Sequence, residues 1–272
     1  MSNKTASHFK GRTAVITGAG SGIGRALAVQ LARHGARLAL SDVSEAGLAE
    51  TLRQCEGGQA RGYRVDVSRR DEVFRHADEV RRDFGGAHFV FNNAGVTLVS
   101  TIAHSTMEEI DWQLGVNLWG VIHGTKAFLP MMLAQRDGHV VNISSVFGMA
   151  GIYAQGPYNI SKFGVRGLTE CLWWELEGTG VKATTVHPGG IRTQIGHTAR
   201  MGAHAGEDEK RLLPLMDKLL ITPPEQCARA ILDGVARGKR RIVTGHKARL
   251  IDAITRLLPT SYQALIRRDI EK

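Results

Sequence analysis

Short apolar runs alternate with longer amphipathic stretches along most of this chain. The runs are rich in β-branched and aliphatic residues, and most of them are apolar on both faces. Such runs are typical of parallel strands that helices cover on both sides. The pattern predicts strands at Thr13–Thr17, Arg37–Ser41, Ala60–Val65, His88–Phe91, His139–Ser144, Lys182–Val186 and Arg241–Thr244.

The stretches between these runs carry helix signals. Ser68 with Asp71, and Thr106 with Glu109, have the spacing of a capping box at a helix start. Strand–helix units that repeat without a linker or a composition break predict one α/β domain, a doubly wound parallel sheet of about seven strands with helices on both faces. A closed eight-stranded barrel is the alternative. It is disfavoured because the glycine-rich turn follows the first strand and not a late one.

Composition narrows the class of protein further. A chain of 272 residues with 43% hydrophobic and 22% charged residues is not disordered, collagenous or of low complexity. The cysteines Cys55, Cys171 and Cys227 suit neither a disulfide framework nor a zinc site, and no histidines have metal-ligand spacing, so we predict no metal. The polar start and the lack of a long apolar run lead us to expect a cytoplasmic protein.

The positive charge is concentrated near the C-terminus. The formal net charge is +9, and the segment from Arg237 to Lys272 holds ten Lys and Arg against three acidic residues, a net +7. The rest of the chain is therefore close to neutral. This distribution of charge does not favour a general nucleic-acid-binding surface, so we expect no nucleic-acid partner.

A glycine-rich turn follows the first predicted strand and opens the next helix. Its sequence is Thr17-Gly-Ala-Gly-Ser-Gly-Ile-Gly24, and the glycines at 18, 22 and 24 form the pattern G-x-x-x-G-x-G. Without side chains, the backbone amides can approach a pyrophosphate at the positive end of the helix. The spacing differs from the G-x-G-x-x-G fingerprint, but strand, turn and helix come in the required order. We therefore predict a dinucleotide-binding turn.

Asp42 ends the second predicted strand, 18 residues beyond Gly24. A carboxylate there can accept hydrogen bonds from the ribose hydroxyls of adenosine, and it would repel a 2′-phosphate. No Lys or Arg lies inside the glycine turn or directly after Asp42. The sequence therefore predicts NAD as the cofactor in preference to NADP. The alternatives are a solvated aspartate in a turn and the cap of the next helix.

Tyr158 and Lys162 are four residues apart, so on a helix they share one side. An ammonium there is expected to lower the tyrosine pKa from about 10 toward neutrality and make Tyr158 a usable acid and base. Ser145 lies 13 residues upstream, just past a predicted strand, where strand ends meet the crevice of a doubly wound sheet. It is placed to hold a substrate oxygen, the alternative being a helix cap.

These motifs together resemble the short-chain dehydrogenase/reductase family, over roughly Gly11 to Gly245. They occur in the family's order, which makes the joint match specific. The matching positions are Thr17-Gly-x-x-x-Gly-x-Gly24, Asp66, Asn92-Asn-Ala-Gly95, Asn117, Ser145, Tyr158-x-x-x-Lys162, and Pro188-Gly189 with Thr193.

The resemblance implies a role for each position. Tyr158 would exchange a proton with the substrate oxygen, Ser145 would bind that oxygen, Lys162 would hold the nicotinamide ribose, and Asn117 would support a proton-relay water. His187 is expected to be structural or a pocket wall. The expected cofactor-binding residues are Gly18, Ser21, Gly22, Ile23, Gly24, Asp42, Asp66, Val67, Asn93, Ala94, Tyr158, Lys162, Pro188, Ile191 and Thr193.

We divide the chain into a dinucleotide-binding and catalytic domain, residues 1–245, and a C-terminal extension, residues 246–272. Within the domain, residues 194–221 form the lid segment, which we expect to contain no strand and to cover the substrate. Its Leu and Met content favours a medium or large hydrophobic alcohol or ketone as substrate. The resemblance implies a homodimer or homotetramer, assembled through the helices within 106–135 and 158–177.

The C-terminal extension is predicted to be a basic amphipathic helix that Pro259 ends. Its apolar face is expected to pack on its own domain or on a neighbouring subunit. The alternative is peripheral membrane contact with anionic lipid. The residues expected to share the apolar face are Leu250, Ile251, Ile254, Leu257 and Leu258.

The predicted function is an NAD(H)-dependent oxidoreductase that interconverts a secondary alcohol and a ketone or aldehyde. Two other classes are weighed against it: a nucleotide-binding sensor that has lost the chemistry, and a membrane adaptor that uses the basic extension. A sensor that has lost the chemistry should lack one or more of the catalytic residues. In this sequence all four are present: Asn117, Ser145, Tyr158 and Lys162.

Overall fold

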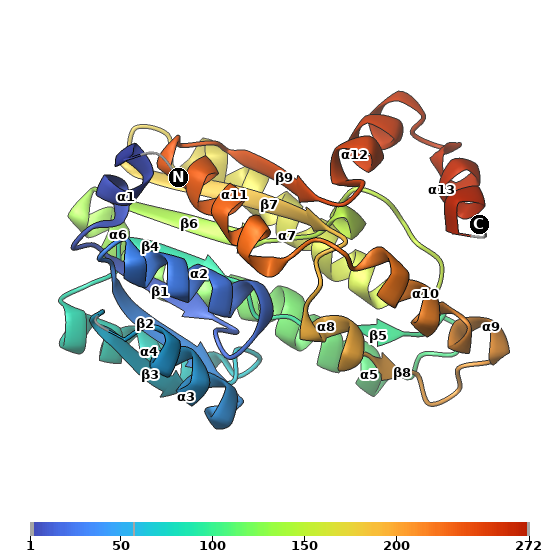
Figure 1. Cartoon of the computed structure of the whole chain (residues 1–272), viewed down its shortest axis with the longest axis horizontal. Coiled ribbons are helices and arrows are strands. Elements are labelled where there is room, and N and C mark those ends of the chain that lie inside the picture. The colour runs from blue at the N-terminus through green and yellow to red at the C-terminus, as the bar shows by residue number, and fades with distance from the viewer. Residues whose placement is uncertain (1–2, 57, 271–272) are drawn as a thin grey trace.

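A parallel sheet of seven strands forms the centre of the molecule in the computed structural model, which describes residues 3–56 and 58–270 (Figure 1). The strand order is β3-β2-β1-β4-β6-β7-β9. The order reverses between β1 and β4, the point at which doubly wound sheets bind ligands. The strands are β1 Thr13–Thr17, β2 Arg37–Asp42, β3 Ala60–Arg64, β4 Phe89–Asn92, β6 Gly138–Ile143, β7 Val181–Gly189 and β9 Arg241–Gly245.

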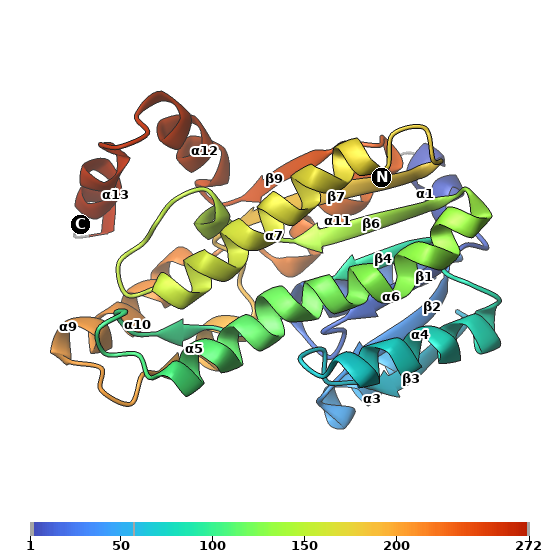
Figure 2. The same ribbon diagram turned by 180° about the vertical axis from the view of Figure 1, so that it is seen from behind.

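Helices cover both faces of this sheet, as Figures 1 and 2 show from opposite sides. The predicted doubly wound fold and all seven predicted strands are confirmed, with β7 running on past Val186 to Gly189. The short N-terminal helix α1 was not predicted. One face holds α1 Asn3–Phe9, α2 Gly22–Arg33, α3 Glu45–Gln54 and α11 Pro224–Ala236, and the other holds α4 Arg70–Phe84, α6 Gly120–Gln135 and α7 Gly156–Glu175.

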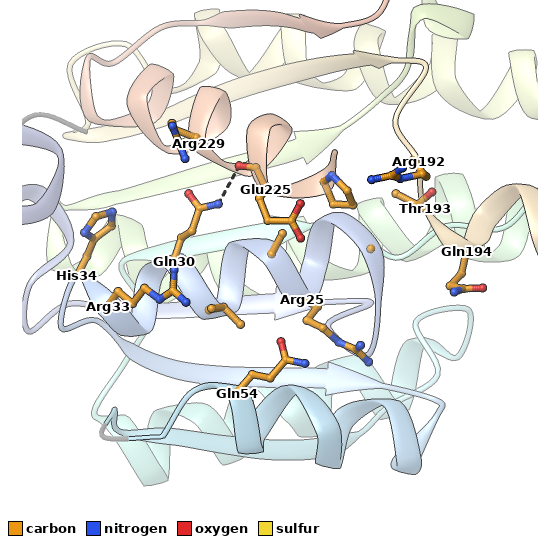
Figure 3. A pocket seen from close by; sticks show the side chains of 14 residues that line it. Arg25, Gln30, Arg33, His34, Gln54, Arg192, Thr193, Gln194, Glu225 and Arg229 are labelled. Carbon is orange, nitrogen blue, oxygen red and sulfur yellow. Dashed lines mark hydrogen bonds between the residues drawn. The ribbon is translucent and has the colours of Figure 1, made fainter. Parts of the chain in front are cut away.

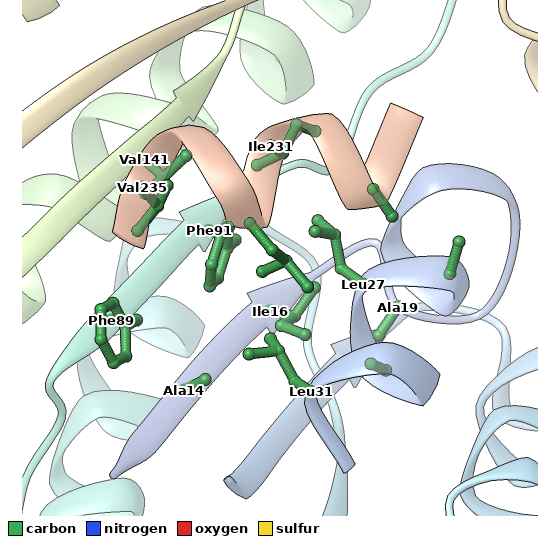
Figure 4. Packing of buried hydrophobic residues seen from close by; sticks show 14 of the residues in the cluster. Ala14, Ile16, Ala19, Leu27, Leu31, Phe89, Phe91, Val141, Ile231 and Val235 are labelled. Atoms are coloured by element: carbon green, nitrogen blue, oxygen red, sulfur yellow. The ribbon is translucent and has the colours of Figure 1, made fainter. Parts of the chain in front are cut away.

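Alternate side chains of the central strands fill two separate apolar cores. In β1, Ala14 and Ile16 pack toward α2 and α11, whereas Val15 packs on the opposite side of the sheet. Figure 4 shows the first core, in which Phe91 and Ile231 lie together. Because β1 is buried on both faces, its sequence shows no alternation of apolar and polar residues.

The lid segment differs from the prediction in one respect. It contains a two-residue strand, β8 Arg200–Met201, which pairs in parallel with β5 Leu98–Val99. The expectation of no strand was wrong because the pairing partner lies far away in sequence and leaves no local pattern. The other elements of the lid segment are α8 Gln194–His197, α9 Glu207–Lys210 and α10 Leu212–Leu219.

A buried carboxylate fastens the lid segment to the loop after β5. Glu209 of α9 accepts hydrogen bonds from the amide (3.4 Å) and the hydroxyl (3.1 Å) of Thr101, and it lies 2.5 Å from Nδ1 of His104. The bond with His104 is the main cause that lowers the pKa of Glu209 to about 2. The carboxylate is therefore charged at neutral pH and holds the segment to the body of the protein.

One predicted capping box is present and the other is not. Thr106 and Glu109 exchange both bonds of the box at the start of α5, Met107–Leu114. The box at Ser68 was wrong: Arg69 is the N-cap of α4 and makes no side-chain cap bond. The Ser68 hydroxyl instead donates to Oδ1 of Asp66 (2.7 Å), so a local turn takes the side chain.

The C-terminal extension forms two helices, α12 Ala248–Leu257 and α13 Tyr262–Ile270, with Pro259 between them. Residues 271–272 of the extension and 1–2 of the predicted domain lie outside the described residues. The predicted apolar face is only partly correct, because Leu250 and Leu257 are exposed, at 55% and 79%. Among the described residues, no helix has the length and apolar character needed to cross a membrane.

Candidate active site

A cleft of about 540 Å³ lies at the carboxyl ends of the central strands. It runs from Asp42 at one end to Tyr158 at the other. Of the predicted site residues, Gly24 and Asn117 do not line it. The predicted residues that do are Gly18, Ser21, Gly22, Ile23, Asp42, Asp66, Val67, Asn93, Ala94, Ser145, Tyr158, Lys162, Pro188, Ile191 and Thr193.

The glycine turn is held by close backbone packing. Gly18 has a φ of +65°, and a Cβ on Gly24 would collide with the carbonyl oxygen of Gly18. The amide nitrogen of the Asn93 side chain donates to the carbonyls of Thr17 (2.9 Å) and Gly18 (3.1 Å). Gly24 thus shapes the turn from behind, which explains why it does not line the cleft.

The Asp42 carboxylate lies beside the glycine turn. Its Oδ2 accepts from the amide of Gly20 (2.7 Å), and its Oδ1 accepts from the amide of Ser44 (2.9 Å). These bonds orient the carboxylate, and each oxygen keeps a further lone pair for a ligand hydroxyl. Asp66 also lines this end of the cleft, where its Oδ1 accepts from the amide of Ser68 (2.9 Å).

Ser145, Tyr158 and Lys162 converge at the other end. Ser145 caps the 3₁₀ turn η2, Val146–Gly148, and its Oγ accepts from the amide of Phe147 (3.1 Å). The Ser145 hydroxyl is also close enough to Tyr158 to act on its pKa. The Lys162 ammonium lies 5.5 Å from the centre of the Tyr158 ring and donates to the carbonyl of Ile143 (3.0 Å). Ser145 therefore both caps a helical turn and places its side chain in the cleft.

The pKa of Tyr158 differs from the prediction. Burial raises it to about 12, and the Ser145 hydroxyl opposes this only in part. Burial also lowers the pKa of Lys162 to about 8. The expected shift of Tyr158 toward neutrality was wrong, because loss of solvation outweighs the attraction of an ammonium that is bound to a carbonyl. At neutral pH Tyr158 carries its proton.

His187 supports Ser145 from the next strand. Its Nδ1 donates to the main-chain carbonyl of Ser145 (3.0 Å), and its Nε2 lies 3.3 Å from the Thr185 hydroxyl. Burial lowers the pKa of His187 to about 4, so the ring is neutral at pH 7. This fully buried position fits the structural role expected for it.

Asn117 lies behind the cleft in a π-helical turn, η1, Gly115–Trp119. Its side chain accepts from the Val96 amide and donates to the Val96 carbonyl, both at 2.8 Å. Gly95 separates it from Lys162: a Cβ built there would lie 3.4 Å from Asn117 Oδ1 and 3.6 Å from Lys162 Nζ. A π-helical turn inside an α-helix is frequent at functional sites.

The sequence reasoning missed a pair that lines the substrate end. The guanidinium of Arg200, in β8, lies 3.8 Å from the centre of the Trp112 ring in α5. This cation–π contact joins the lid segment to the cleft wall. The two residues are far apart in the chain, and the missed β5–β8 pairing is what brings them together.

A larger hollow of about 850 Å³ lies outside the cleft, between α2 and α11 (Figure 3). Its lining includes Arg25, Arg33 and Arg229, and it meets the cleft at the glycine turn. Inside it, the Gln30 amide donates to the carbonyl of Glu225 (2.8 Å). Its lining holds neither the Tyr158–Lys162 pair nor Ser145, so size alone does not make it the active site.

Comparison with known proteins agrees with this geometry. A family model described as "short chain dehydrogenase" matches residues 12–203. The putative oxidoreductase SadH of Mycobacterium tuberculosis is 45% identical over 271 residues, which cover 98% of each chain. The chain belongs to the short-chain dehydrogenase/reductase family. The resemblance drawn from the sequence motifs is therefore confirmed, and the protein is an oxidoreductase of a family that uses NAD or NADP.

Solved structures of the same family carry both nucleotides. A short-chain dehydrogenase/reductase from Burkholderia phymatum in complex with NAD is 35% identical, with a TM-score of 0.85 over 92% of this chain and 93% of that one. A metagenomic short-chain oxidoreductase in complex with NADP is 28% identical, with a TM-score of 0.70 over 85% and 92%. Membership of the short-chain dehydrogenase/reductase family thus leaves the choice of nucleotide to local residues such as Asp42.

The residues of the cleft fit a dinucleotide. Cβ atoms at Gly18 and Gly22 would meet Ala94 and Thr193, so the cradle that admits a pyrophosphate exists only with glycine at these positions. The N-terminus of α2 begins at Gly22 and offers free amides to an anion. One end of the cleft presents the Asp42 carboxylate and the other presents hydroxyls and an ammonium.

Proposed function

We propose that this short-chain dehydrogenase/reductase is an NAD(H)-dependent enzyme that interconverts a secondary alcohol and a ketone or aldehyde. The observation that carries the proposal is the convergence of Ser145, Tyr158 and Lys162 at one end of a cleft that presents Asp42 at the other. A sensor without chemistry would not need this set. The bound cofactor would supply or accept the hydride.

Tyr158 acts as the acid in the reducing direction. Because its pKa is about 12, it holds a proton at neutral pH and gives it to the substrate oxygen as the carbonyl carbon gains a hydride. Ser145 hydrogen-bonds the same oxygen and stabilises the Tyr158 phenolate that remains. Lys162 adds positive charge and holds the nicotinamide ribose, and Asn117 supports the water that returns the proton. In the oxidising direction each proton moves the opposite way.

The cofactor contacts follow the length of the cleft. We propose that the glycine turn binds the pyrophosphate and that Asp42 binds the adenosine ribose, with residues 1–245 as the catalytic domain and 194–221 as its lid. The assigned positions are Gly18, Ser21, Gly22, Ile23 and Gly24 at the pyrophosphate, Asp42, Asp66, Val67, Asn93 and Ala94 at adenosine, and Tyr158, Lys162, Pro188, Ile191 and Thr193 at nicotinamide.

The substrate is proposed to be a medium or large hydrophobic alcohol or ketone. Three apolar side chains of the cleft support this, and one of them, Phe147, meets the Tyr158 ring edge-on. Apolar walls exclude water from the reacting atoms and bind an apolar substrate body. These side chains belong to Trp112, Phe147 and Leu220.

We propose a homodimer or homotetramer that buries the exposed faces of α6 and α7. Phe163 and Trp174 of α7 support this, being exposed at 42% and 80%. For the C-terminal extension we favour packing on its own domain, which Ala248 and Tyr262 contact. A lipid-binding extension is the alternative, and it would make the protein co-sediment with anionic vesicles in a salt-dependent manner.

The first prediction concerns the choice of nucleotide. We expect kcat/KM with NADH to exceed that with NADPH by at least about tenfold, because a 2′-phosphate would approach the Asp42 carboxylate. The measurement is NADH or NADPH oxidation against a panel of ketones of graded size, from cyclohexanone to 2-decanone. Asp42→Ser should narrow the ratio. A preference of the wild-type enzyme for NADPH would contradict the assignment of Asp42, and no turnover of any panel member would count against the proposed function.

The second prediction is a pH profile. Burial lowers the pKa of Lys162 to about 8, so the ammonium predominates below that pH and is lost above it. We expect kcat/KM for NADH to be level below pH 8 and to fall about tenfold per unit above it, since this parameter reports groups of the free enzyme. Tyr158 should add no step below about pH 11. A level profile up to pH 10 would show that Lys162 does not titrate in this way.

A further inference from the structure

We propose that the C-terminal extension is a positioning element of the active site. It holds the segment 145–155, which begins at Ser145 and ends three residues before Tyr158, in its working position. The inference rests on the proposed function for its kinetic consequences, and on contacts of α12 and α13 for its structural basis. Figures 1 and 2 show these two helices at the end of the sheet that also carries the lid helices.

The first contact is apolar and lies directly behind Ser145. Ala248, at the start of α12, is fully buried in a cluster with Val146 and Met149, and Ile251 packs against that cluster. Val146 is the first residue of η2, the 3₁₀ turn that Ser145 caps. Packing of α12 on this turn therefore fixes the backbone from which the Ser145 hydroxyl reaches the cleft.

The second contact is an ion pair between the sheet and α12. Asp252 accepts two hydrogen bonds from Arg241 of β9, at 2.8 and 2.7 Å, and one from Arg256 at 2.9 Å. The bond with Arg241 is the main cause that holds the pKa of Asp252 well below its usual range. Arg241 also contacts the sulfur of Met149 (2.6 Å), so the same side chain touches α12 and the segment 145–155.

The third contact is made by α13. The Tyr262 hydroxyl accepts a hydrogen bond from the amide of Gly151 (2.8 Å), in the middle of the segment. On either side of Gly151, the side chain of Asn159 binds the Ala150 carbonyl (2.7 Å) and the Ile152 amide (3.1 Å). Asn159 of α7 thus binds the residues on both sides of Gly151, and Tyr262 of α13 binds Gly151 itself.

These contacts reach the reacting groups through Phe147. Its ring meets the Tyr158 ring edge-on, at 5.8 Å and 90°, and it packs against the cluster that Ala248 completes. Phe147 and Gln155, from the same segment, also line the cleft. A segment that moved would displace both the substrate wall and the surroundings of Tyr158. The extension therefore acts on the chemistry without touching the cofactor.

The test compares two Tyr→Phe substitutions, each of which removes a single hydroxyl group. Tyr262→Phe removes only the hydroxyl that binds Gly151, whereas Tyr153→Phe removes the hydroxyl of an exposed tyrosine on the same segment and serves as the control. Asp252→Asn is the second test variant, because it weakens the ion pair with Arg241 while keeping the shape of the side chain. All variants are made in the full chain, and NADH binding is measured for each.

Hydrogen exchange gives a readout that needs no substrate. We expect the Gly151 amide and peptides within 145–155 to exchange about tenfold faster in Tyr262→Phe and Asp252→Asn than in the wild type and in Tyr153→Phe. Exchange in the glycine turn should not change. Equal exchange in all four proteins would overturn the proposal whether or not the enzyme turns over any ketone of the panel.

Kinetics then separate a positioning role from a merely structural one. For 2-decanone we expect kcat/KM to fall about three- to tenfold in Tyr262→Phe, with the affinity for NADH changed less than about twofold. Tyr153→Phe should match the wild type. Faster exchange with an unchanged kcat/KM would overturn the proposal, since the contact would then hold the segment without affecting the site. If the wild-type enzyme turned over no ketone of the panel, that result would instead count against the proposed function.

Discussion

Tyr158→Phe is expected to reduce kcat for ketone reduction by about 10² to 10⁴-fold. The substitution removes the one hydroxyl that, in the proposed mechanism, gives a proton to the substrate oxygen. It keeps the ring that meets Phe147 edge-on, so the cleft should hold its shape. The measurement is a single-turnover rate with saturating NADH, which reports the chemical step without product release.

The control for this variant is binding. The affinity for NADH should change less than about threefold, because the phenyl ring and Lys162 both remain. Ser145→Ala should also lower kcat but leave residual activity, since Tyr158 still supplies the proton. Unchanged turnover in Tyr158→Phe would contradict the assignment of Tyr158 as the proton donor. NADH binding without turnover in the wild type would support the sensor hypothesis.

Burial decides the roles of both ionisable groups at this end of the cleft. It raises the pKa of Tyr158 to about 12 and lowers that of Lys162 to about 8, so both shifts favour the neutral form. Spacing on a helix places the two groups on one side but contains no information on solvation. The sequence could therefore identify the pair, and only the three-dimensional environment could give the direction of each shift.

The parts of the fold that the sequence predicted are those with a local cause. β1, β4 and β6 are buried on both faces, so each is a short apolar run between polar segments. The glycine turn and the Tyr158–Lys162 spacing are also local signals. The capping box at Ser68 shows the limit of such signals, because Asp66, two residues away, competes successfully for the same hydroxyl.

The parts that it did not predict depend on contacts between distant segments. β8 forms only because β5 lies beside it, and Arg200 reaches Trp112 for the same reason. Likewise, nothing near Tyr262 in sequence indicates that its hydroxyl binds Gly151, 111 residues away. The amphipathic pattern of α12 predicted a helix, but the buried side is set by η2 at Ala248 and Ile251.

Gly24→Ala is expected to weaken NADH binding by about 5- to 150-fold. A Cβ at this position would collide with the main-chain carbonyl of Gly18, and it would lie 2.7 Å from the side-chain nitrogen of Asn93. The Gly18 main chain has little freedom to move away from this Cβ, so the glycine turn must open. Strain of this kind costs about 1–3 kcal/mol, which corresponds to that range of affinity if the turn regains its shape only on binding.

Gly167→Ala provides the matched control for the glycine turn. Gly167 is a helical glycine of α7, exposed, with no atom within 4 Å of an added Cβ. Since alanine is the better helix former, this variant should fold well and bind NADH like the wild type. Isothermal titration with NADH measures both variants, and circular dichroism checks that both remain folded. If Gly24→Ala bound NADH as tightly as Gly167→Ala, the close packing of Gly24 on Gly18 would not be what shapes the pyrophosphate cradle, because the same added methyl group would then be tolerated in both places.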